Sequence, residues 1–180
     1  MTLVPLVVLS GLLILAGALK LARPYAAVDA LNAVSLPGGA LIVRLLAGLE
    51  VVVGASALTL PGRWAAALLG AAFLGLAAAT LRLARERSVA VDHASGCGCF
   101  GAAGPPVHLI HVTFNLAGAA LGTAGAAAGT EATPLSALTA GGWAESAILA
   151  LGIGCAVALS YLVLTALPTL WTVWQPKARS

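Results

Sequence analysis

The chain has 180 residues, of which 61% are hydrophobic and 8% are charged, and its mean hydropathy is +1.03. A soluble domain carries about 25% charged residues, so this composition excludes a soluble enzyme and a disordered chain. Nine lysine and arginine residues against six acidic ones are too few for a nucleic-acid-binding surface. The composition therefore predicts a protein embedded in a lipid bilayer, with no nucleic-acid partner.

Five segments are long and apolar enough to cross a bilayer, which requires roughly 20 residues of helix. They cover residues 3–21, 38–60, 64–83, 107–128, and 143 to 171 or 174. We therefore expect an all-α fold, a polytopic membrane helix bundle. Residues 1–130 would form a four-helix core and 131–142 a loop. Residues 143–180 would form a fifth, C-terminal transmembrane helix and a short basic tail.

Glycines recur at four-residue spacing in the fourth segment, in the pairs Gly118/Gly122 and Gly125/Gly129. Small residues at this spacing let helix backbones approach closely in lipid. We expect these glycines to pack against a neighbouring helix. Cys155, in the fifth segment, is likewise predicted to be a small packing residue.

The basic residues are distributed unequally between the two faces of the predicted bundle. Arg63 is the only one expected on the face that carries the N-terminus. The opposite face holds Lys20, Arg23, Arg82, Arg85, Arg87, Lys177 and Arg179. The positive-inside rule then places the N-terminus outside the cell and the loop between the third and fourth segments in the cytoplasm.

That loop contains Cys97 and Cys99, one residue apart and flanked by glycines. A disulfide between such close cysteines is strained, and strained disulfides are more often labile or catalytic than structural. A redox-active dithiol is the first interpretation, and inert cysteines are another. A copper or zinc site made with His108 and His111 is the third, although Cys-x-Cys is not the usual zinc spacing.

Ionisable and polar residues inside the predicted helices form a second pattern. His108, His111 and Asn115 are spaced i, i+3, i+7 and so share one stripe of the fourth segment. Lys20 and Arg44 belong to the same half of the membrane as this stripe. Ionisable groups at such depth usually face the bundle interior or a cavity.

Glu50 lies deeper, near the middle of the second segment, where a carboxylate needs a partner or a proton. We therefore expect Glu50 to belong to a polar network. The complete predicted site has four catalytic and four supporting residues. The catalytic ones are Cys97, Cys99, His108 and His111, and the supporting ones are Lys20, Arg44, Glu50 and Asn115.

Three of these features together resemble the methylamine utilisation protein MauE family, which belongs with the DoxX-like four-helix membrane proteins. They are the Cys-Gly-Cys-Phe-Gly run that begins at Cys97, the Lys20-Leu21-Ala22-Arg23-Pro24 segment, and Glu50. The resemblance covers about residues 12–128. The family often has an arginine before the asparagine of the fourth helix, where this chain has Phe114, so His111 or Arg44 would have to replace it.

The resemblance implies a thiol-disulfide oxidoreductase, or a redox subunit, that helps to mature a periplasmic amine dehydrogenase. Its partner would be a thioredoxin-like protein or a client thiol protein, a quinone is a candidate cofactor, and the location would be the bacterial cytoplasmic membrane. A metal-binding protein using Cys97, Cys99, His108 and His111 and a non-catalytic assembly scaffold remain alternatives. Monomeric and oligomeric forms are both open. Oxidative thiol chemistry belongs outside the cytoplasm, whereas the charge bias places the cysteine loop inside.

Overall fold

The computed structural model describes residues 3–32, 39–87, 109–129 and 131–174. The regular structure in these ranges is helical throughout. The helices are α1 (Leu3–Ala22), α2 (Tyr25–Asn32), α3 (Ala40–Thr59), α4 (Gly62–Arg87), α5 (Leu109–Ala128), α6 (Pro134–Thr139) and α7 (Trp143–Trp174). Five of them, α1, α3, α4, α5 and α7, are long and apolar enough to cross a membrane. The protein is therefore a multi-pass membrane protein with an all-α fold, as its composition predicts.

Two short helices lie between the predicted segments. α6 forms within the stretch predicted as a loop, because Thr133 Oγ accepts a hydrogen bond from the Ser136 N–H at 3.0 Å and Pro134 occupies the first turn. α2 follows Pro24, whose carbonyl accepts the N–H groups of Ala27 and Val28 at 3.0 Å. Both helices depend on side-chain or proline chemistry at their starts and have too few residues to show an apolar period.

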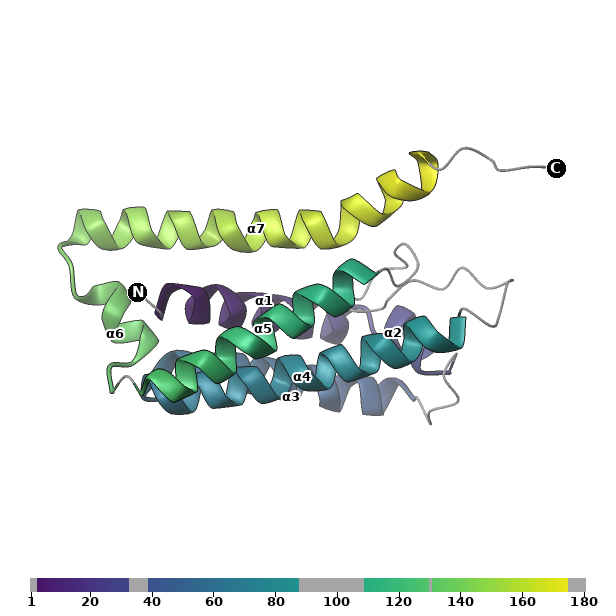
Figure 1. Ribbon diagram of the computed structural model, residues 1–180, viewed down its shortest axis with the longest axis horizontal. Coiled ribbons are helices and arrows are strands. Elements are labelled where there is room, and N and C mark those ends of the chain that lie inside the picture. Colours follow the sequence, from purple (N-terminus) through teal and green to yellow (C-terminus); the bar gives the residue numbers. More distant parts are fainter. Residues whose placement is uncertain (1–2, 33–38, 88–108, 130, 175–180) are drawn as a thin grey trace.

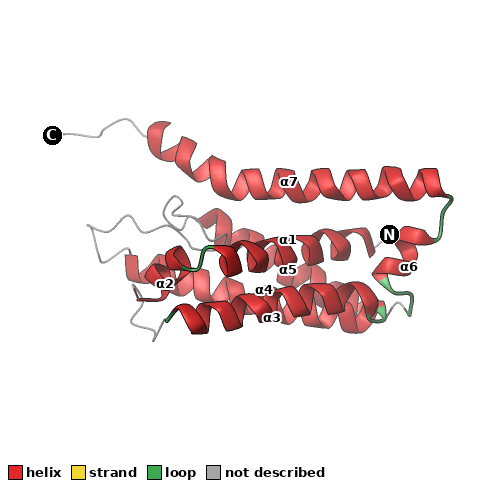
Figure 2. Cartoon of the chain, turned by 180° about the vertical axis from the view of Figure 1, so that it is seen from behind, coloured by secondary structure: helices red, strands yellow, loops and turns green. Residues whose placement is uncertain are grey.

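The four helices of the core form two layers. Figure 1 shows α4 and α5 in front of α1 and α3, and Figure 2 shows the α1 and α3 layer from behind. α7 runs alongside α1, outside the four-helix bundle. α2, the end of α4 and the start of α5 lie at one end of the bundle, here named the α2 end, and α6 lies at the other.

Glycines bring the helices of each layer into close contact. A Cβ atom added at Gly17 of α1 would lie 2.6 Å from the Ala47 carbonyl oxygen of α3. A Cβ atom at Gly122 of α5 would lie 2.5 Å from the Gly70 Cα of α4. Gly129 differs from the predicted packing role, because with φ +67° and no atom within 4 Å of a Cβ it ends α5.

Gly122→Ala is expected to lower the free energy of unfolding by about 1–3 kcal/mol, the usual range for overpacking. The new methyl group would meet backbone atoms of α4, which cannot move aside as a side chain can. The matched control is Gly75→Ala, on the exposed face of α4, where a Cβ meets nothing within 4 Å. Equilibrium unfolding in mixed micelles measures both variants, and equal stabilities would contradict the predicted close contact.

α7 is the least buried of the long helices. Only 6% of an 18-residue apolar window within Trp143–Ala166 is buried, and Ile148 and Leu151 are more than two-thirds exposed. Cys155 is also exposed, so the predicted packing role is not realised in this chain. Most of α7 therefore presents an apolar surface to its surroundings, as suits a helix in lipid.

Candidate functional site

Polar residues interrupt the buried stripes of three core helices. On α3 the inward stripe runs through Val43, Ala47, Glu50, Gly54 and Ala57, at alternating spacings of four and three residues. On α5 the same spacing gives His111, Asn115, Gly118, Gly122 and Gly125. Lys20 is the buried polar residue near the end of α1. The helix period thus directs all of these polar groups into the bundle.

Lys20 and Glu50 form an ion pair between α1 and α3. Lys20 Nζ donates to Glu50 Oε1 at 2.5 Å and to Glu50 Oε2 at 2.7 Å. The two side chains are 11% and 15% exposed, so the pair lies largely inside the bundle. The partner that the mid-helix carboxylate requires is therefore Lys20, and the two charges cancel within one site.

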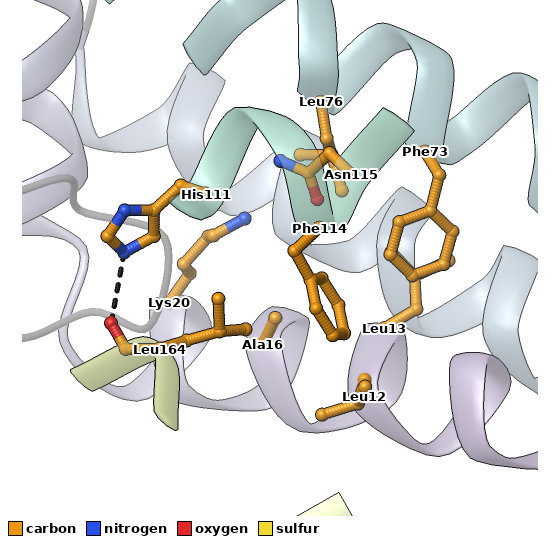
Figure 3. A pocket seen from close by; sticks show the side chains of 10 residues that line it. All are labelled: Leu12, Leu13, Ala16, Lys20, Phe73, Leu76, His111, Phe114, Asn115 and Leu164. Carbon is orange, nitrogen blue, oxygen red and sulfur yellow. Dashed lines mark hydrogen bonds between the residues drawn. The ribbon is translucent and has the colours of Figure 1, made fainter. Parts of the chain in front are cut away.

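A small pocket, here named the central pocket, lies against Lys20 of this ion pair and takes side chains from three core helices, α1, α4 and α5, and from α7 (Figure 3). Its volume is about 40 Å³. Its lining is mainly apolar and consists of Leu12, Leu13, Ala16, Lys20, Phe73, Leu76, His111, Phe114, Asn115 and Leu164. One buried water needs roughly 10–15 Å³ of such space, so the central pocket has room for about three.

Asn115 contributes an unusual group to the central pocket. Its side chain is 9% exposed, and within the described ranges its amide forms no hydrogen bond. Figure 3 shows the amide among the side chains that line the pocket. The amide atoms are not fully buried, because Ser10 Oγ is the one fully buried side-chain atom without a partner among the described residues. The amide is therefore accessible from the pocket and suited to bind a water molecule or another hydrogen-bonding group.

His111 connects α5 to α7. Its Nε2 lies 3.0 Å from the carbonyl oxygen of Leu164, and the imidazole is 5% exposed (Figure 3). A carbonyl oxygen only accepts hydrogen bonds, so Nε2 must carry the proton. The contact therefore fixes both the orientation of the ring and its tautomer.

A second pocket, here named the end pocket, lies on the other side of the ion pair, toward the α2 end. Its volume is about 140 Å³. It is lined by Lys20, Ala27, Ala30, Leu31, Val43, Leu46, Glu50, Leu76, Ala79, Thr80 and Leu83. The Thr80 hydroxyl donates to the Leu76 carbonyl at 2.8 Å. Lys20 lines both pockets and so lies between them.

Residues 1–129 match the family model described as Methylamine utilisation protein MauE. The chain belongs to this family. The match covers the helices α1 to α5, whereas α6 and α7 follow it. No curated protein and no solved structure gives a significant match to the chain.

This MauE-family chain brings four of the predicted site residues together. Lys20 and Asn115 line the central pocket, where His111 joins them, and Glu50 is held by Lys20. Arg44 instead lies one position off the inward stripe of α3 and is exposed. The cysteines Cys97 and Cys99 and the histidine His108 lie outside the described residues.

The contribution of α7 was not predicted from the sequence. Leu164 is 5% exposed, lines the central pocket and supplies the carbonyl that His111 contacts. One sequence signal was available. Pro168 stands four residues after Leu164 and cannot provide the backbone N–H that this carbonyl would normally accept in a helix.

The metal-site alternative gains no support from the described part of the MauE-family chain. Within it, no three His, Cys, Asp or Glu side chains are placed to hold a metal ion. His111, one of the predicted ligands, directs its Nε2 to a carbonyl oxygen. A site of this kind would depend on Cys97, Cys99 and His108.

Proposed function

We propose that this protein is a membrane thiol-disulfide oxidoreductase, or the membrane redox subunit of one, that works through Cys97 and Cys99. The observation that carries the proposal is the group of buried polar residues near the α2 end, formed by Lys20, Glu50 and His111. The chain segment that contains the cysteines joins Arg87, which ends α4, to α5. His111 follows that segment directly, in the first turn of α5. Membership of the MauE family supports the same chemistry.

The proposed reaction is thiol-disulfide exchange with two protein partners. A thiolate of Cys97 or Cys99 attacks a disulfide of the client and forms a mixed disulfide, which the other cysteine resolves. The client disulfide takes up two electrons and two protons and becomes two thiols, and Cys97 and Cys99 become a disulfide. The second partner is a thioredoxin-like protein, whose two thiols return two electrons and two protons to Cys97 and Cys99 and form a disulfide. The family name suggests that the client is a protein of methylamine utilisation.

The other predicted site residues would have two roles, proton transfer and stabilisation of charge. His111 and His108 are the proposed proton carriers, because an imidazole titrates near neutrality. Lys20 is compensated by Glu50, so we assign stabilisation of a thiolate to Arg44, which forms no ion pair with another described residue. The Lys20–Glu50 pair and Asn115 would supply polar groups inside the bundle.

A quinone was a candidate cofactor, and the two pockets test its fit. An engineered cavity of about 150 Å³ accommodates benzene. The central pocket has about 40 Å³ and the end pocket about 140 Å³. A quinone ring with its two oxygens and substituents is larger than benzene, so neither of these two pockets accommodates it. A third, more open pocket of about 550 Å³ between α4 and α5 is large enough, but its lining is almost wholly apolar. The proposed exchange is written between two thiol proteins and uses no quinone step.

We propose the bacterial cytoplasmic membrane as the location, with the N-terminus outside, from the charge bias of the sequence. Differential alkylation of Cys97 and Cys99 in intact cells tests this. A membrane-permeant reagent modifies them on either side, whereas an impermeant reagent reaches them only from outside. Protection from the impermeant reagent supports the cytoplasmic side, and modification by it reverses the proposed orientation.

Cys97→Ser and Cys99→Ser are each expected to reduce exchange with a thioredoxin-like partner at least about 100-fold, because one cysteine alone cannot resolve a mixed disulfide. One of the two variants should also accumulate a covalent complex with its partner, visible on a non-reducing gel. Cys155→Ser is the matched control, because Cys155 is exposed on α7. Full function of the Cys97→Ser/Cys99→Ser double variant would refute the redox proposal in favour of a scaffold.

A further inference from the structure

α7 contains a proline in a position that exposes a backbone acceptor. Pro168 lies inside the helix, and proline has no N–H to donate to the carbonyl four residues earlier. That carbonyl belongs to Leu164. Figure 1 shows α7 changing direction in its C-terminal, yellow part, as expected where a helix hydrogen bond is missing.

His111 of α5 donates to the carbonyl that Pro168 leaves without its helical donor. The 3.0 Å contact from Nε2 to the Leu164 oxygen is buried, so little water competes for it. It is also one of few ties between α7 and the core. α7 also approaches α1 closely at Gly11, where an added Cβ would lie 3.1 Å from Val157 Cγ2.

We infer that α7 completes the MauE-family site by fixing the tautomer of His111, with Pro168 as the positioning residue that makes the Leu164 carbonyl available. The neutral ring carries its proton on Nε2, so its lone pair lies on Nδ1. Nδ1 is then the nitrogen that accepts and releases the proton in the exchange reaction. This last step rests on the proposed function, whereas the assignment of the tautomer does not.

The inference gives α7 a specific role, although the family match ends at residue 129. A helix that only anchored the chain would need no contact with a buried histidine. Here Leu164 of α7 makes two contributions to the site. Its side chain lines the central pocket, and its carbonyl oxygen accepts a hydrogen bond from His111 Nε2. Orienting a histidine through a hydrogen bond to its second nitrogen is a general way of setting which nitrogen reacts.

The test is ¹⁵N NMR of the full-length protein in bilayers, labelled at histidine, with the His111 signals assigned by their loss in His111→Gln. The wild type is expected to show His111 mainly as the Nε2–H tautomer. Pro168→Ala restores a backbone N–H that competes for the Leu164 carbonyl, so the tautomer ratio should shift about two- to tenfold toward Nδ1–H, the range expected for one hydrogen bond.

Three controls separate this role from simple packing. Leu164→Ala keeps the carbonyl and should leave the tautomer ratio unchanged, as should Pro5→Ala in the first turn of α1. A disulfide between Gly11→Cys and Val157→Cys reports whether α7 stays docked in each variant. Loss of this cross-link together with the tautomer shift in Pro168→Ala would overturn the assignment of Pro168 as a positioning residue.

A wild-type His111 in the Nδ1–H form would overturn the inference, and so would a ratio that Pro168→Ala leaves unchanged. Because the spectra report the ring itself, they do not depend on thiol exchange. An Nε2–H tautomer combined with full activity of the Cys97→Ser/Cys99→Ser variant would refute the proposed function and leave the tautomer assignment standing.

Discussion

Lys20→Met is expected to lower the free energy of unfolding by about 3–5 kcal/mol, the cost of leaving one member of a buried ion pair alone. Glu50 would then have a charge inside the bundle with no partner, because Lys20 is the only lysine or arginine among the residues that line the end pocket. Glu50→Gln removes the opposite charge and should have an effect of the same sign. Equilibrium unfolding in mixed micelles measures both, with the exposed Arg44→Met as the control that stays within about 0.5 kcal/mol of wild type.

The double variant Lys20→Met/Glu50→Leu distinguishes a stabilising pair from one retained for function. Replacing both charges by apolar side chains is often neutral or stabilising, because both desolvation costs disappear. We expect the double variant to regain most of the stability that either single variant loses. Strictly additive losses in this double-mutant cycle would contradict the direct pairing of Lys20 Nζ with the Glu50 carboxylate.

The same double variant tests what the pair does. A folded and stable protein that has lost thiol exchange would show that the charges serve the reaction. A folded protein with full exchange would restrict the pair to packing α1 against α3. Since burying two ions gives little net stability, a functional reason for keeping them is the outcome that we expect.

The spans could be predicted from the sequence because a bilayer sets their length, and the inward stripe of α5 could be predicted because its period is local. The partner of Glu50 could not be chosen in the same way. Lys20 and Arg44 both belong to the α2 half of the bundle. The choice follows from the close approach of α1 and α3 at Gly17, and from the position of Arg44 one residue off the inward stripe of α3.

The contact between His111 and α7 could not be predicted for a different reason. The apolar residues of α7 are distributed around the whole helix, and much of its length is exposed, so no pattern marks the face that docks. Pro168 indicates that one carbonyl lacks its usual donor, but it does not indicate which residue replaces that donor. Only the three-dimensional arrangement brings Leu164 to His111.

Asn115→Leu is expected to change stability and activity in opposite directions. The residue is 9% exposed, its amide forms no hydrogen bond with another described residue and is not fully buried, and leucine has a similar volume, so the substitution should raise the free energy of unfolding by at most about 1 kcal/mol. Exchange activity should fall about tenfold or more if the amide holds water in the central pocket for proton transfer to His111. A substitution that raises stability and lowers activity is typical of a residue that is retained for the reaction.

Thr113→Val is the matched control for Asn115→Leu, because it removes a polar group from the exposed face of the same helix. The Thr113 hydroxyl donates to the Leu109 carbonyl at 3.1 Å and does not line either pocket. We expect this variant to keep wild-type exchange activity. A loss of stability in Asn115→Leu would mean that the amide has a structural partner. Unchanged activity at higher stability would remove Asn115 from the site and leave Lys20, Glu50 and His111 as its polar residues in the bundle.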